Sequence, residues 1–186
     1  MKYVSLDIET TGLDPYQDQI LEVGAIIEDT KNLKPREECP QFHVYVDNER
    51  LRGEIFAISM NSNILKKILE LKNNKDEINL VTPYNIIPAL VTFLKNNGIE
   101  KATFAGKNFA SFDLQFFKKL YTFSDLKMHH RFLDPTTLFT DFEHDEVLPD
   151  LAKCKVRAGI KGNVTHEALD DAWDVIELLR MKYEHN

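Results

Sequence analysis

The sequence is poor in cysteine and has no apolar run long enough to cross a membrane. Its two cysteines, Cys39 and Cys154, lie far apart and match neither a disulfide framework nor the spacing of a zinc site. A β-forming segment follows Met1 directly, so we expect no signal peptide. These scarcities favour a reducing compartment, and we expect a cytoplasmic protein without membrane contact.

A surplus of positive charge is also missing, because 30 acidic residues outweigh 23 basic ones and the net charge is −7. This balance argues against a protein that grips long duplex nucleic acid by charge alone. It leaves open an enzyme that holds a strand end at bound cations, since such ions reverse the local charge. No linker divides the 186 residues, so we expect one domain spanning residues 1–186.

Two acidic residues share one face of the first predicted strand, residues 3–9. Side chains alternate along a strand, which places Asp7 and Glu9 opposite the apolar positions. Like charges at this spacing repel unless a cation lies between them, and Mg²⁺ or Mn²⁺ prefers carboxylate oxygen. The pair alone fits half a metal site and an exposed acidic strand edge about equally well.

The rest of the pattern predicts a short meander followed by alternating helices and strands. Further strands are expected at residues 19–28, 41–46, 102–106 and 131–134, and helices at residues 62–72, 82–95, 114–120, 151–158 and 165–183. Short connections between the first three strands indicate antiparallel pairing. This order predicts an α/β fold around a mixed sheet.

Acidic residues recur in the middle and at the end of the chain. Asp113 opens a helix after a segment that interleaves polar groups with Phe109 and Phe112, a pattern suited to stacking a base. Either phenylalanine taken singly is more typical of a core. His166 stands at the start of the last helix, where a histidine could reach water and take a proton, although a surface histidine without a catalytic role is the more common case. The acidic stretch at residues 141–146 is interpreted as a solvated loop.

Three segments, in order, resemble the motifs of the DnaQ-like 3′–5′ exonucleases of the DEDDh class. They are residues 7–12, residues 108–113 and residues 166–172, and together they span nearly the whole chain. The resemblance implies a ribonuclease H-like fold, with a mixed five-stranded sheet flanked by helices. It also implies a metal-dependent 3′–5′ exonuclease that acts on single-stranded or frayed DNA or RNA ends and releases nucleoside 5′-monophosphates.

The resemblance assigns the site residues one by one. It implies that His166 is the general base and that two divalent cations, Mg²⁺ or Mn²⁺, are bound by four carboxylates, those of Asp7, Glu9, Asp113 and Asp171. Asp170 and Asp174 are then expected to be helix-surface acids.

A second group of residues is expected to bind the terminal nucleotide. Its members are Thr10, Thr11, Gly12, Met60, Asn108 and Phe112. Residues 55–63 depart from the family, because many members carry a His-Gly pair where this chain has Ile58-Ser59-Met60-Asn61. The departure concerns the substrate pocket and not the metal site.

Two other functions remain open at this point: a catalytically silent domain that uses the fold to bind a partner, and a proofreading subunit attached to a polymerase. The complete set of acids argues against the first, and the lack of a tail after the last helix favours a stand-alone enzyme over the second. A homodimer and a polymerase partner are both compatible with the sequence. The expected partner in catalysis is a nucleic acid 3′ end, and no residue separates DNA from RNA.

Overall fold

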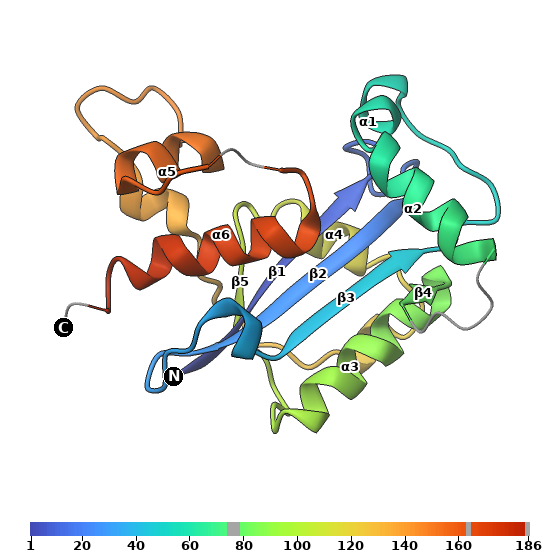
Figure 1. Cartoon of the computed structure of the whole chain (residues 1–186), viewed down its shortest axis with the longest axis horizontal. Helices are drawn as coiled ribbons and strands as arrows, with labels where there is room; N and C mark the ends of the chain where they lie inside the picture. The colour runs from blue at the N-terminus through green and yellow to red at the C-terminus, as the bar shows by residue number, and fades with distance from the viewer. Residues whose placement is uncertain (74–78, 163–164, 185–186) are drawn as a thin grey trace.

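The computed structural model describes residues 1–73, 79–162 and 165–184, and its centre is a five-stranded mixed sheet (Figure 1). β1 (Lys2–Thr10), β2 (Ile20–Asp29) and β3 (Gln41–Val46) pair antiparallel. The two-residue strands β4 (Leu80–Val81) and β5 (Phe104–Ala105) join the edges in parallel, giving the order β4-β3-β2-β1-β5. The predicted α/β class and the antiparallel meander are confirmed.

The membership of the sheet differs from the prediction at both edges. Within the described chain, residues 131–134 contribute only an isolated bridge between Leu133 and Ala105, not a strand. The chain turns at once into the 3-10 helix η4 (Pro135–Phe139), whose N-cap Asp134 accepts a hydrogen bond from the Thr136 N–H. Proline cannot donate to a ladder and its φ suits the first turn of a helix, so the strand stops there. The fifth strand is instead β4, which no pattern indicated.

The two faces of β1 belong to different parts of the core. Val4, Leu6 and Ile8 pack in the cluster that contains the apolar residues of α3 (Ile86–Asn96) and α4 (Asp113–Phe117). On the other face, Ser5 Oγ donates a hydrogen bond of 2.7 Å to the Ala172 carbonyl in α6 (Ala168–Arg180). The predicted alternation therefore holds, and Asp7 and Glu9 share the side of β1 that faces α6.

Helices cover both faces of the sheet. α6 lies along β1 and β2, and α5 (Leu151–Ala158) packs against α6 (Figure 1). α1 (Ile55–Met60) and α2 (Ser62–Asn73) follow β3, and α2 packs beside β2, β3 and β4. Three short 3-10 helices complete the described elements: η1 (Arg36–Glu38), η2 (Pro83–Asn85) and η3 (Phe123–Asp125). No helix in the described ranges is long and apolar enough to cross a membrane.

The last helix begins later than the pattern predicted. His166 has a φ of 56°, in the left-handed region, so the helix cannot include it and starts at Ala168 instead of Thr165. The predicted end of α5 is correct, because Gly159 takes a φ of 71° at the C-terminal cap, a conformation that glycine adopts without steric cost. The late start of α6 leaves His166 on an irregular turn beside the helix.

Candidate active site

A pocket of about 610 Å³ is formed by β1, the turn before α4, the start of α5 and the turn before α6. Five of the residues that line it are those that the three motifs single out, which are Asp7, Glu9, Asp113, His166 and Asp171. Residues from the beginning, middle and end of the chain therefore meet in one concave site.

Three potential ligand atoms, from β1, from the segment before α6 and from α6 itself, lie close together. One side-chain atom each of Glu9, His166 and Asp171 lies within 4.8 Å of the other two. Glu9 and Asp171 are buried, whereas His166 is exposed. An exposed imidazole beside two buried carboxylates can exchange a proton with water while it faces the acids.

Asp113 is fixed to β1 by a backbone hydrogen bond. It is the first residue of α4, only 2% exposed, and its Oδ1 accepts a hydrogen bond of 3.1 Å from the Ile8 N–H. Ile8 stands between Asp7 and Glu9, so this contact places the third carboxylate level with the first two. The start of a helix also favours an acidic side chain through its unpaired N–H groups.

Burial and mutual repulsion disfavour the charged forms of these acids. Burial, helped by the charges of Asp171 and Glu22, raises the pKa of Glu9 to about 8. Burial raises the pKa of Asp113 to about 7 and, with help from Asp174, that of Asp171 to about 7. The pKa of Asp7 is also raised well above its usual value, by burial and then by Asp113 and Asp171.

The donor set fits a divalent cation. Asp171 Oδ1 is buried and has no hydrogen-bond partner in the described chain. A buried acceptor of this kind, beside other carboxylates, is costly unless a cation satisfies it. Because the surrounding ligands are mainly carboxylate oxygens, the site suits a hard ion such as Mg²⁺ or Mn²⁺ better than a soft metal.

Two of the predicted nucleotide-binding residues, Asn108 and Phe112, line the pocket. Asn108 adopts a φ of 58°, and its N–H donates a hydrogen bond of 3.0 Å to Asp134 Oδ2. Phe112 packs against Phe116, with 5.2 Å between ring centroids, and keeps one side toward the pocket. Phe109 is part of the core instead, at 1% exposure, as the alternative interpretation held.

The Thr-Thr-Gly turn lies beside the pocket wall and is occupied by internal contacts. Thr10 Oγ1 donates to the Gly12 carbonyl, and Thr11 Oγ1 accepts from the Gln19 N–H. A Cβ on Gly12 would lie 2.3 Å from Asp18 Oδ2, so any larger residue at this position would displace the Asp18 side chain. A role for this turn in nucleotide binding stays a prediction that concerns its backbone.

The divergent segment places one residue near the acids that sequence reasoning missed. Met60 is 45% exposed on α1 and lies outside the pocket wall, so its predicted contact with substrate stays untested. Asn61 is 2% exposed, its Nδ2 donates a hydrogen bond of 2.9 Å to the Thr10 carbonyl, and its amide lowers the pKa of Glu9. Its Oδ1 is buried without a partner in the described chain. Asn61 stands in the segment that departs from the family pattern, and no pattern in the sequence assigned it a role.

The prediction that Asp174 is a helix-surface acid is wrong. Asp174 is 7% exposed, and its Oδ2 accepts a hydrogen bond of 2.6 Å from Lys155 Nζ on α5, which is itself 5% exposed. The spacing within α6 could not reveal this partner, because it comes from another helix. Asp170 is closer to expectation, since it forms a partly exposed ion pair with Arg36.

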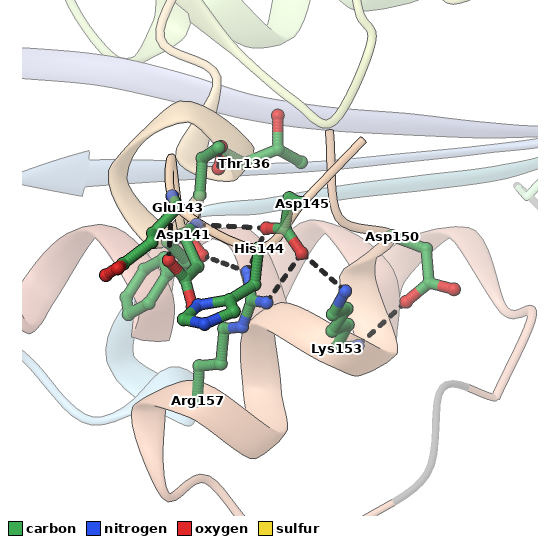
Figure 2. A network of polar contacts seen from close by, with 10 residues as sticks. Thr136, Asp141, Glu143, His144, Asp145, Asp150, Lys153 and Arg157 are labelled. Carbon is green, nitrogen blue, oxygen red and sulfur yellow. Dashed lines mark hydrogen bonds and ion pairs between the residues drawn. The ribbon is translucent and has the colours of Figure 1, made fainter. Parts of the chain in front are cut away.

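The acidic loop before α5 is exposed at Asp141, Glu143 and Glu146, as predicted for a solvated loop, but it also contains an ion-pair network around Asp145. Figure 2 shows Arg157 and Lys153 reaching from α5 to the Asp145 carboxylate, whose side chain is only 1% exposed. Asp141 pairs with His144 in the same network. The guanidinium and ammonium groups hold the pKa of Asp145 well below its usual value.

Comparison with known proteins extends this picture. The family model of the RNase_T exonucleases, described as Exonuclease, matches residues 4–179. The chain belongs to the RNase_T exonuclease family. A member with 27% identity over 184 residues is an oligoribonuclease of Photorhabdus laumondii, and the match covers 97% of this chain and 92% of that protein.

Solved structures show the same fold. The nuclease domain of 3′hExo, a DEDDh family member bound to rAMP, has a TM-score of 0.67 at 15% identity and is covered over 92% of its length. Exonuclease I of E. coli, in complex with a dT13 oligonucleotide, has a TM-score of 0.65 at 14% identity. This chain spans 42% of exonuclease I, so that likeness concerns one part of the larger protein.

The predicted DnaQ-like 3′–5′ exonuclease with a ribonuclease H-like fold is confirmed by the RNase_T family match and the fold. Membership of this family implies dependence on a divalent metal, in agreement with the acid cluster. The silent interaction module and the proofreading subunit are not favoured, because the relatives that match over most of their length are oligoribonucleases.

Proposed function

We propose that the enzyme removes nucleotides one at a time from the 3′ ends of short single-stranded RNA, and more slowly from DNA. The observation that carries the proposal is the convergence of Glu9, His166 and Asp171 within 4.8 Å, in a pocket that Asp7 and Asp113 also line. A base, a set of metal ligands and room for a strand end are the parts that phosphodiester hydrolysis needs.

Four carboxylates would hold two cations, Mg²⁺ or Mn²⁺: those of Asp7, Glu9, Asp113 and Asp171. When bound, the ions supply positive charge at the phosphate and acidify water. The unpartnered Oδ1 of Asp171 and the raised pKa values support this assignment, since both features disappear once a cation is present. Cation binding at these residues would require their carboxyl groups to be deprotonated.

His166 is proposed as the general base. Its imidazole lies on the irregular turn before α6, exposed to water and next to Glu9 and Asp171. It takes one proton from the attacking water, whose oxygen forms a bond to phosphorus while the bond from phosphorus to the 3′ oxygen breaks. The 3′ oxygen leaves with a proton from solvent, and the products are a nucleoside 5′-monophosphate and a strand shortened by one nucleotide.

The pocket supports a small substrate end. Its volume of about 610 Å³ falls in the range of roughly 300–1,000 Å³ that is typical of small-molecule sites. Phe112 offers an aromatic face and Asn108 an amide, which suits an unpaired terminal nucleotide. The proposed preference for RNA rests on the oligoribonuclease relatives of similar length.

The test is a matched set of five-nucleotide RNA and DNA strands, single-stranded and in duplexes, incubated with Mg²⁺ or Mn²⁺. We expect mononucleotides from the 3′ end, fastest with single-stranded RNA. Absence of release with either metal would refute the proposed activity. Equal rates on duplex and single strands would refute the proposed substrate class while leaving the chemistry intact.

A further inference from the structure

The first turn of α6 is capped by a side chain from another element. α6 has no side-chain hydrogen bond from its own N-cap residue, Glu167. Instead Glu22, on β2 and 1% exposed, accepts a hydrogen bond of 3.0 Å from the Ala168 N–H through its Oε2. Helix N-terminal N–H groups need an acceptor, and a carboxylate is the strongest one available.

A second feature of β2 brings the same turn against the sheet. A Cβ on Gly24 would lie 2.4 Å from the carbonyl carbon of Ala168 and 2.4 Å from the Leu169 nitrogen. Only glycine leaves room for this approach. Glu22 and Gly24 are two residues apart on one strand and therefore face the same side, so together they form a seat for the first turn of α6.

Two residues of the active site depend on the position of that turn. His166 stands two residues before Ala168, and Asp171 stands three residues after it. Ala168 is fully buried, and the Asp171 N–H donates to the Glu167 carbonyl. Any shift of the turn therefore moves the imidazole and the carboxylate relative to Glu9, which belongs to the sheet.

We propose that Glu22 is a positioning residue of the active site, and this inference rests on the proposed function, in which His166 is the base. Glu22 lies outside the pocket wall and acts through the α6 turn. Its other oxygen, Oε1, is hydrogen-bonded to His43 Nε2 on β3. Because both oxygens accept or share a hydrogen bond, the carboxylate is held in one orientation. The first turn of α6, and with it the segment that carries His166, therefore has a fixed position before substrate binds.

β2 also supplies a matched control. Glu28, on the same strand and likewise 1% exposed, accepts a hydrogen bond of 2.7 Å from Arg180 at the opposite end of α6. Removing either carboxylate deletes a buried contact between β2 and α6. Only the Glu22 contact lies beside the active site, so a general loss of stability and a loss of positioning can be separated.

The experiment compares Glu22→Ala, Glu22→Gln and Glu28→Ala, with kcat and KM measured on a short single-stranded RNA below the melting temperature of each variant. For Glu22→Ala we expect kcat to fall by about 100-fold, as for a small misplacement of catalytic groups, with KM nearly unchanged. Glu28→Ala should lower the melting temperature and leave kcat close to wild type. The Ala168 amide proton, followed by NMR, should move upfield in Glu22→Ala alone.

Glu22→Gln keeps the shape and both contacts, because its carbonyl can accept from Ala168 and its amide can donate to His43. It should retain most of the wild-type kcat, and it keeps the test valid if the alanine variant does not fold. Equal loss of kcat in Glu22→Ala and Glu28→Ala would overturn the proposal. So would a glutamine variant as slow as alanine, or an Ala168 resonance that does not move. If the wild type released no nucleotide, the proposed function would fall, while the NMR comparison would still test the contact.

Discussion

Two acidic clusters of similar composition behave in opposite ways. In the pocket, burial raises the pKa values of Glu9, Asp113 and Asp171. In the loop before α5, hydrogen bonds to basic side chains lower the pKa values of Asp141 and Asp145 (Figure 2). The two clusters therefore differ in burial and in hydrogen-bond partners, and not in the kind of acidic group.

In the loop cluster, basic side chains of the protein itself pair with the central carboxylate. Arg157 holds Asp145 with two N–H groups and Lys153 adds a third contact, so that carboxylate has little capacity left for a ligand. Lys107 is the one lysine or arginine in the described pocket wall, and Asp171 Oδ1 has no partner in the described chain. Acids left without partners in a concave site indicate function, whereas paired acids indicate structure.

The largest expected effect is a loss of activity when one acid of the pocket cluster is replaced. Asp113→Asn keeps the acceptor for the Ile8 N–H and removes one charge from the pocket. We expect nucleotide release to fall to background, because even partners outside the ligand set commonly contribute about 10–100-fold. Calorimetry with Mn²⁺ should show weakened binding in parallel.

The matched substitution in the other cluster is Asp145→Asn, which removes the same charge near Arg157. Its activity per folded molecule should equal that of the wild type. Activity that survives Asp113→Asn, or that is lost in Asp145→Asn, would contradict the assignment of catalysis to the pocket acids and of a structural role to the loop acids.

The second effect concerns the base. His166→Ala should lower kcat by about 10²–10⁴-fold, the usual contribution of general acid–base catalysis, with little change in KM. His166 is exposed, so the melting temperature should stay constant. The corresponding change in the loop, His144→Ala, should leave kcat unaltered. An unchanged kcat in His166→Ala would remove it from the mechanism.

The third effect is a pH dependence of stability without metal. Glu9, Asp113 and Asp171 have raised pKa values in the folded state, so they favour folding below their unfolded pKa of about 4. That contribution is lost as the pH rises through about 7 to 8. In EDTA the melting temperature should therefore fall between about pH 5 and pH 8, and added Mg²⁺ should restore it. A flat profile in EDTA would contradict the assigned burial of these acids.

The smallest effect has the opposite sign and belongs to the loop. Asp145 has a lowered pKa, so its contribution to stability is present above pH about 4 and is lost only in more acidic solution. Asp145→Asn should lower the melting temperature slightly at pH 7, and the difference from wild type should shrink steadily as the pH falls below about 4. A variant as stable as wild type at pH 7 would mean that the exposed partners of the network contribute nothing measurable.

Predictions from the sequence were correct where the residues of a single segment determine the local structure or form a recognisable motif. Strand alternation put Asp7 and Glu9 on one face, and the three motifs predicted which acids would be neighbours; the structure places them in one pocket. Such predictions failed where the partner lies elsewhere in the chain. The Lys155–Asp174 pair and the contact of Glu22 with Ala168 join different elements, and no local pattern encodes them.

The edges of the sheet were the least predictable part of the fold. β4 has only two residues, Leu80 and Val81, which pair with β3, and a strand this short has no alternation that the sequence could reveal. Residues 131–134 have the apolar character of a strand, yet Pro135 leaves them a single bridge. The sequence also does not show why a glycine is present: a side chain at Gly12 would displace that of Asp18, whereas one at Gly24 would collide with the backbone of α6.

Asp134 has one further consequence. Its Oδ2 holds the Asn108 N–H, and its Oδ1 accepts from both the N–H and the hydroxyl of Thr136. The segment that presents Asn108 to the pocket is thus ordered in the free enzyme by a carboxylate outside the pocket wall. A nucleotide that binds beside Asn108 does not have to order a flexible segment, so little conformational entropy is lost on binding. Order that is present before binding favours ligands that have few contacts to offer.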